Sequence, residues 1–391
     1  MAYSFEELLG GSRLRPIMKS VDLNIQRLST DGTTYRDGEP DPALYKMLPL
    51  TSYLSLEQAF LKFQGDRPMM GSVVALDQEI PQERPRMQLT EENVGNFKIG
   101  QSRLFTEKDY QLLYKLRMMQ ATPGMAAAAN ELMMAFQAMP VTLSSGVLYK
   151  LFYMACRVLC LGQAAYTDPK TNYRVDLSYL DSVPSGHFAA AKTGTGRWSQ
   201  PSTATGVQDL VDHLTVYYNT LRRYPTIGMN SLTFTQLRNQ QATKEMVLRD
   251  LGVLSTLDAT NQTALSMVAG ATPEQIATAI GRRLTMQTGQ PGQVSLLITD
   301  GVGYERNKDG SVTQFPYIPN DYYFFVNPGI IEQAILPNAA NDFAGGMAVT
   351  TEILSKDPRR ESVTASGVCV PLCFDPRYLG ARNVNDTAIA V

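Results

Sequence analysis

Hydrophobic residues are most densely patterned between residues 143 and 162, LSSGVLYKLFYMACRVLCLG. They leave only a narrow polar stripe, which carries Lys150 and Arg157, seven positions apart and therefore on one helix face. The spacing predicts a helix of about 18 residues, roughly 27 Å long. Ser144 or Ser145 is suited to cap its start, and the glycine that closes the segment is suited to end it.

A helix that is apolar on nearly every side must be covered by other parts of the protein. We therefore expect residues 143–162 to form a core helix around which the chain is organised. A membrane span is disfavoured because each of its two cations would cost about 2.5 to 3.5 kcal/mol at a bilayer centre. We expect Pro140 to separate this helix from the helical segment before it.

Shorter periodic segments lie on both sides of the core helix. A helical period predicts helices at residues 55–64, 107–120, 124–139, 206–223, 235–252 and 272–284. Thr106 with Asp109, and Thr272 with Glu274, are start signals for two of them. Apolar or alternating runs predict strands at residues 72–76, 86–90, 96–104, 173–180, 229–234, 294–300, 321–329, 346–354 and 363–374, with a hairpin tip at Asn307–Gly310. The mixture predicts an α+β fold whose late strands return to the core helix.

Two early segments have too little apolar material to fold alone. Residues 1 to about 50 are punctuated by Pro and Gly and show no sustained period, which is typical of an arm that lies on another surface. Residues 67–105 predict a two-stranded ribbon with Glu83, Arg84 and Arg86 near its tip. Because two strands bury too little surface to stand free in water, the ribbon needs a partner, and a second subunit is a natural candidate.

Composition narrows the function classes. The chain has 391 residues, 44% hydrophobic and 18% charged, with a net charge of −2, which fits two or three globular units and disfavours electrostatic wrapping of nucleic acid. The start MAYSFEELL has neither a basic nor an apolar export segment, so we expect no signal peptide. The four cysteines, Cys156, Cys160, Cys369 and Cys373, are expected to be buried free thiols in a reducing compartment.

No segment predicts catalysis, a cofactor or a metal site. Only two histidines occur, and we expect His213 along a helix surface and His187 in a loop. Gly186–Thr193 nearly fits a phosphate loop, but Ala191 stands where the second glycine is needed. Lys192–Gly194 resembles the KTG element of penicillin-binding enzymes, but no lysine has a serine three residues earlier. We interpret the Gly-rich segment 186–196 as a flexible loop, with a hydrolase or transferase as the alternative.

The order of the features resembles the major capsid proteins of tailed bacteriophages with the HK97 fold, and most of all the branch of the phage lambda head protein. The strings that support this resemblance are FKIGQSRLF, LYKLFYMACRVLCLGQ, YRVDLSYL, RWSQPSTATGVQDL, GMNSLTFTQLRNQ, PNDYYFFVNPG and VCVPLCFDPRYLG. The resemblance implies the following parts: an N-terminal arm at 1–55, an extended loop at 66–105, a peripheral domain at 106–205 and 330–391 that contains the spine helix 143–162, and an axial domain at 206–329.

The resemblance further implies a structural protein of the virion, with no enzymatic activity and no cofactor, assembled in the host bacterial cytoplasm. Hexamers and pentamers would form an icosahedral shell around double-stranded DNA, with the loop tip at Glu83, Arg84 and Arg86 as a subunit contact. The chain lacks the charged, coiled N-terminal segment that serves as a built-in scaffold in some members, which implies a separate scaffolding protein and a portal. A decoration protein is also compatible, and a membrane is not involved. Another phage assembly component, a tail tube or a portal, is the alternative within this class.

Overall fold

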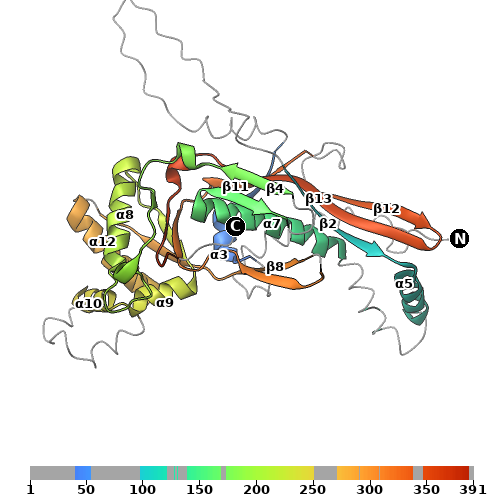
Figure 1. Ribbon diagram of the computed structural model, residues 1–391, viewed down its shortest axis with the longest axis horizontal. Coiled ribbons are helices and arrows are strands. Elements are labelled where there is room, and N and C mark those ends of the chain that lie inside the picture. The colour runs from blue at the N-terminus through green and yellow to red at the C-terminus, as the bar shows by residue number, and fades with distance from the viewer. Residues whose placement is uncertain are drawn as a thin grey trace, which may run out of the picture.

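The computed structural model describes residues 40–53, 97–120, 127, 130, 139–168, 173–250, 271–289, 291–307, 309–337 and 347–386. The described part is elongated, with a long central helix between two different ends (Figure 1). One end carries four helices, α8 (Gly206–Leu221), α9 (Ser231–Asn239), α10 (Gln241–Asp250) and α12 (Pro273–Thr288). The other end carries three strands and a helix, β2 (Phe97–Phe105), β12 (Ala348–Lys356), β13 (Arg359–Cys373) and α5 (Glu107–Gln120).

The predicted core helix is α7 (Met139–Leu161). It ends where predicted, because Gly162 takes a φ of 69° and its N–H donates to the Val158 carbonyl at 2.8 Å. The predicted start at Ser144 or Ser145, and the break at Pro140, are wrong. Pro140 lies in the first turn, where a missing N–H costs no hydrogen bond. By length and composition α7 could cross a membrane, but 78% of its most apolar window is buried inside the protein, as in a core helix.

A five-stranded sheet covers one side of α7. Its longest strand, β13, packs directly on the helix and pairs antiparallel with β2, β12 and β11 (Ile331–Leu336), while β1 (Leu50–Ser52) pairs parallel with β11. The prediction that late strands return to the core helix is therefore confirmed. All four cysteines lie on α7 and β13 and are buried and free, as expected, and burial raises the pKa of Cys369 to about 12. Strand β11 was not predicted.

A second five-stranded sheet separates α7 from the helical end. Its order is β5 (Phe188–Ala189), β14 (Ala381–Asn383), β10 (Tyr322–Val326), β6 (Thr226–Met229) and β7 (Ser295–Ile298). Along β10, Phe324 belongs to the same core as α7, whereas Tyr323 and Phe325 belong to the core under α8 and α12. Alternate side chains of one strand thus serve two cores. Gly228 lies under the Phe324 ring, where an added Cβ would come within 2.2 Å of a ring carbon.

Two hairpins and one short α-helix also belong to the described fold: β3 (Gln163–Thr167) with β4 (Arg174–Ser178), β8 (Val302–Arg306) with β9 (Val312–Pro316), and α3 (Pro42–Met47). The second hairpin confirms the tip predicted at Asn307–Gly310. The start signals at Thr106 and Thr272 are also confirmed, since Thr106 bonds to Asp109 and Thr272 forms a capping box with Gln275.

The strand predicted at 229–234 is wrong. Strand β6 ends at Met229, and the side chain of Asn230 accepts a hydrogen bond from the Thr233 N–H at 2.8 Å, which starts helix α9 instead. The Asn cap overrides the local preference of the β-branched and aromatic residues that follow it. The predicted helix at 55–64 and the predicted strands at 72–76 and 86–90 lie outside the described residues. The α+β class is confirmed.

Candidate assembly surface

The end of the molecule that carries β12 projects away from the central helix (Figure 1). We call this part the ribbon unit and define it as β2, α5, β12 and residues 359–366 of β13. At residues 361–366, β13 pairs with β2 and with β12 at once, so these two strands form the outer edges of a three-stranded ribbon. The described residues place no further strand beside either edge. Backbone groups on an open edge are ready to pair with another strand.

The two faces of the ribbon differ. Directly paired residues point to the same face, and Val363 and Ala365 of β13 are buried in the core that also contains residues of α7 and α5. The opposite face carries small or polar side chains at most positions. Its β2 and β12 residues are solvent-exposed, namely Lys98, Gly100, Ser102, Leu104, Thr350 and Glu352, and its β13 residues Ser362 and Thr364 are half-buried. A sheet face of this kind is not closed by the rest of the described chain.

Helix α5 is attached to the ribbon by a buried carboxylate. Glu361 is 1% exposed, and it accepts a hydrogen bond from the Tyr110 hydroxyl and forms an ion pair with Arg359 at 3.7 Å. The Arg359 guanidinium lies 5.0 Å from the Tyr110 ring centroid. Burial and the bond to Glu361 raise the pKa of the Tyr110 hydroxyl well above its usual value, so it stays a donor. The attachment holds α5 in a fixed place at the end of the ribbon.

Apolar side chains are concentrated on the outside of the ribbon unit. Thirteen large hydrophobic side chains are exposed in the described residues, and six of them belong to this unit: Leu104, Leu112, Tyr114, Met118, Ile353 and Leu354. Clustered exposed apolar residues are a mark of a protein–protein interface, whereas scattered ones need no explanation. The unit also carries eight basic and four acidic side chains, a charge of +4 in a chain whose total is −2. The ribbon unit therefore exposes large apolar side chains and carries a more positive charge than the rest of the chain.

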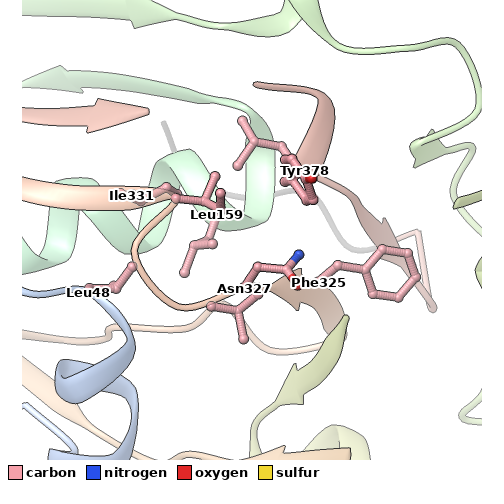
Figure 2. Close-up of a pocket in the computed structure, with 9 residues that line it drawn as sticks. Leu48, Leu159, Phe325, Asn327, Ile331 and Tyr378 are labelled. Atoms are coloured by element: carbon pink, nitrogen blue, oxygen red, sulfur yellow. The ribbon is translucent and has the colours of Figure 1, made fainter. Parts of the chain in front are cut away.

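One small pocket among the described residues does not compete with this surface as a functional site. A pocket between α7 and β10 is lined by Leu159, Phe325 and Ile331, among other mostly apolar residues (Figure 2). The space among them is too small for a water molecule, so this is a packing defect of the core rather than a ligand site. The described residues also bring together no group of His, Cys, Asp and Glu that could hold a metal ion.

The Gly-rich segment 186–196 is not a phosphate loop. Lys192 donates to the buried Asp209 carboxylate at 2.6 Å, and the Trp198 indole donates to the same carboxylate at 3.1 Å. The segment is also paired to the C-terminal strand, since the Lys192 N–H donates to the Asn383 carbonyl. Its interpretation as a flexible loop is wrong, because a buried carboxylate must be paired and both donors come from this segment or next to it. Lys192 forms an ion pair with Asp209 within the chain, which argues against a role for its ammonium in binding phosphate.

His213 is not on a helix surface as expected. It is 4% exposed, because the α8 face that carries it packs against the second sheet. Its Nε2 lies 2.9 Å from the His187 carbonyl and must donate to it, so its Nδ1 accepts from the Tyr323 hydroxyl, also at 2.9 Å. Burial lowers the pKa of His213 to about 4. His187 lies in a loop as expected, and it is buried too.

The predicted subunit-contact residues Glu83, Arg84 and Arg86 lie outside the described residues. No local pattern predicted the exposed surface of the ribbon unit, although one signal was present. Ile353 and Leu354 are consecutive apolar residues in a strand, and neighbours in a strand point to opposite faces, so both cannot face one core.

Comparison with known structures finds similarity to proteins of phage shells. A protein described as a prophage capsid protein of E. coli CFT073 is 12% identical, with a TM-score of 0.43 over 74% of this chain and 77% of that one. The capsid of Myoviridae phage XM1 is 11% identical, with a TM-score of 0.33 over 74% and 72%. A chain of the satellite phage P4 procapsid is 9% identical, with a TM-score of 0.37 over 94% and 99%.

No family model matches the sequence, and no curated protein matches it. The structural neighbours include phage capsid proteins, at identities too low to transfer a role. The proposals below therefore rest on the residues and geometry of this chain.

Proposed function

We propose that this chain is the major capsid protein of a tailed bacteriophage, of the HK97-like class and nearest to the lambda branch. Many copies would form an icosahedral shell of hexamers and pentamers around double-stranded DNA. The observation that carries the proposal is the ribbon unit, whose strand edges and apolar side chains are left open by the described residues and are suited to contact other molecules. The order of a long buried helix, a mixed unit and strands that return to the helix supports the shell class in particular.

The division into parts follows the same proposal. Residues 1–55 form the N-terminal arm and 66–105 the extended loop, with Glu83, Arg84 and Arg86 at a contact with a neighbour. The peripheral domain comprises 106–205 and 330–391, and the axial domain comprises 206–329. The partners are further copies of the chain, non-specifically bound DNA on the inner face, a separate scaffolding protein, a portal and, where present, a decoration protein. The mature location is the virion, after assembly in the host cytoplasm.

Negative-stain electron microscopy of the purified protein tests the proposal. We expect closed particles of uniform diameter, formed with or without a co-expressed scaffolding protein. Tubes would favour a tail-tube protein, and isolated rings would favour a portal protein. A monomer that persists at high protein concentration in light scattering would contradict every assembly reading.

We expect substitutions on the surface of the ribbon unit to reduce particle assembly. Charge reversal of Arg84 and Arg86 together tests the proposed loop-tip contact separately. Exposed ion pairs contribute only about 0 to 1 kcal/mol each, so their effect would come from repetition over many contacts. Unchanged assembly of that variant would remove the two residues from the proposal and leave the ribbon unit untouched.

A further inference from the structure

The hairpin β8–β9 connects two parts of the molecule that have separate cores. It leaves the second sheet after β7 and returns to it at β10, yet its side chains pack on α7. Phe315 lies 4.6 Å from Tyr153 between ring centroids, and Tyr317 lies 5.1 Å from Phe152. Figure 1 shows β8, in orange, running alongside α7 and away from the helical end. The hairpin is therefore a strap onto the central helix from the part formed by α8, α9, α10, α12 and the second sheet, which we call the α8–α12 end.

Lys150 is the polar anchor of this strap. Its ammonium lies 3.3 Å from the Glu305 carboxylate of β8 and 3.2 Å from the Tyr166 ring centroid of β3. Tyr153 and Phe315 contribute two more rings, at 5.2 and 5.8 Å. The Tyr166 hydroxyl donates to the same Glu305 carboxylate. One side chain of α7 thus joins strands of two hairpins through an ion pair and three aromatic rings.

Lys150 lies far along α7 from the place where the second sheet contacts this helix. The second sheet already contacts α7 near Leu159, where Phe325 and Val326 of β10 line the small pocket (Figure 2). Lys150 lies nine residues earlier, about 13 Å along the helix at 1.5 Å per residue. One contact would leave the α8–α12 end free to tilt about Leu159, whereas two contacts separated along a rigid helix fix its angle.

We propose that Lys150 is a positioning residue that, through Glu305 and Tyr166, fixes the angle between the α8–α12 end and the central helix. Within the proposed shell function, on which this consequence rests, the angle decides the curvature at which neighbouring subunits meet. The anchor would then control whether closed particles share one diameter. Burial lowers the pKa of Lys150 to about 8, although Glu305 opposes the shift, so the ammonium is charged at neutral pH.

The angle can be measured in the subunit itself. Spin labels on Tyr173→Cys and Met286→Cys would report the distance between β4 and α12, because both side chains are exposed and the four native thiols are buried. Labelled protein is diluted with unlabelled protein so that only distances within one chain are recorded. We expect one narrow distance distribution, and a broadened or shifted distribution in Lys150→Met. Arg174→Ala is the matched control, since it removes an exposed ion pair with Asp176 on β4.

A milder variant protects the test against misfolding. Tyr166→Phe removes only the hydroxyl that donates to Glu305 and should broaden the distribution less than Lys150→Met. Lys150→Arg keeps the positive charge beside the rings and should also broaden it less than Lys150→Met. Hydrogen exchange of the β8–β9 amides should quicken about tenfold in Lys150→Met. An unchanged distance distribution and unchanged exchange in folded Lys150→Met would overturn the anchor.

Particle imaging of the same variants separates the two proposals. If wild-type protein closes into uniform particles and Lys150→Met gives mixed diameters at a similar melting temperature, the positioning role is supported. If Lys150→Met merely lowers the melting temperature and its particles stay uniform, the role in curvature is wrong. If wild-type protein forms no particles, the shell function fails, and the distance measurement still decides the anchor.

Discussion

The α8–α12 end and the ribbon unit handle apolar surface in opposite ways. The α8–α12 end encloses its own core, in which Trp198, Tyr323 and Phe325 are almost completely buried. Among the described residues, the ribbon unit leaves six large apolar side chains exposed and two strand edges open. A unit with a closed core can hold its shape alone, whereas an open ribbon gains most of its burial from a neighbour. The comparison predicts that mutations in the first change stability and mutations in the second change association.

The largest effect on stability should come from Trp198→Ala. Trp198 is 1% exposed, stacks on Tyr323 at 5.5 Å between centroids and donates to Asp209. Removing a large buried side chain costs about 3 to 5 kcal/mol. Urea unfolding followed by circular dichroism should show this loss, whereas Tyr114→Ala in the ribbon unit should stay within about 0.5 kcal/mol. Equal losses in both variants would contradict the contrast between the two ends.

Acid should weaken the closed end through His213. Its pKa is about 4 in the folded protein and about 6.5 when unfolded. Between these values the unfolded chain binds a proton that the folded one does not, so the free energy of unfolding falls as the pH drops from 6.5 towards 4. The total effect is about 3 kcal/mol. His187, whose pKa burial also lowers, acts in the same direction.

Urea unfolding between pH 4 and 7 checks this expectation. His213→Gln should flatten the dependence of stability on pH, with the remaining slope arising from His187 and the carboxylates. Because glutamine also loses the bond geometry of the ring, its stability at pH 7 should be lower. The same slope in the variant and the wild type would show that His213 does not titrate in this range.

An intermediate effect is expected where the ribbon unit holds α5. Tyr110→Phe removes the hydroxyl that donates to Glu361 and leaves that buried carboxylate with Arg359 as its charged partner. A lost bond to a buried charged group costs about 1 to 3 kcal/mol. Hydrogen exchange should quicken in α5 and not in α8, since the loss is local. Uniform quickening across the chain would mean that the ribbon unit and the body unfold together.

Substitution of an exposed apolar residue in the ribbon unit should have the smallest effect on the free energy of unfolding and a clear effect on assembly. Leu104→Ser on β2 should change the free energy of unfolding by no more than about 0.5 kcal/mol, because the side chain is 48% exposed. Leu232→Ser on α9 is the matched control at 47% exposure. Particle yield should fall for Leu104→Ser and not for Leu232→Ser. Equal yields would remove β2 from the assembly surface.

Local patterns predicted α5, α8, α12 and most of the described strands, whereas two predictions failed because a neighbour in space decides. The helices at α5, α8 and α12 follow from apolar spacing and start signals such as the capping box at Thr272. The exposure of His213 was wrong because nothing local shows that a sheet covers that face of α8. The Gly-rich segment 186–196 was wrongly interpreted as flexible because its partner, Asp209, lies on a different element.

The sequence by itself determined the apolar central helix, its end at Gly162 and the buried state of the four thiols, because these depend on the side chains themselves and their spacing. Only the tertiary structure decided which surfaces stay exposed and which cation on α7 forms a partly buried ion pair with ring contacts. Lys150 and Arg157 share one polar stripe in the sequence, but only Lys150 meets Glu305 and the Tyr166 ring. Contacts between residues far apart in the chain depend on how sheets pack on that helix, and no local period encodes that packing.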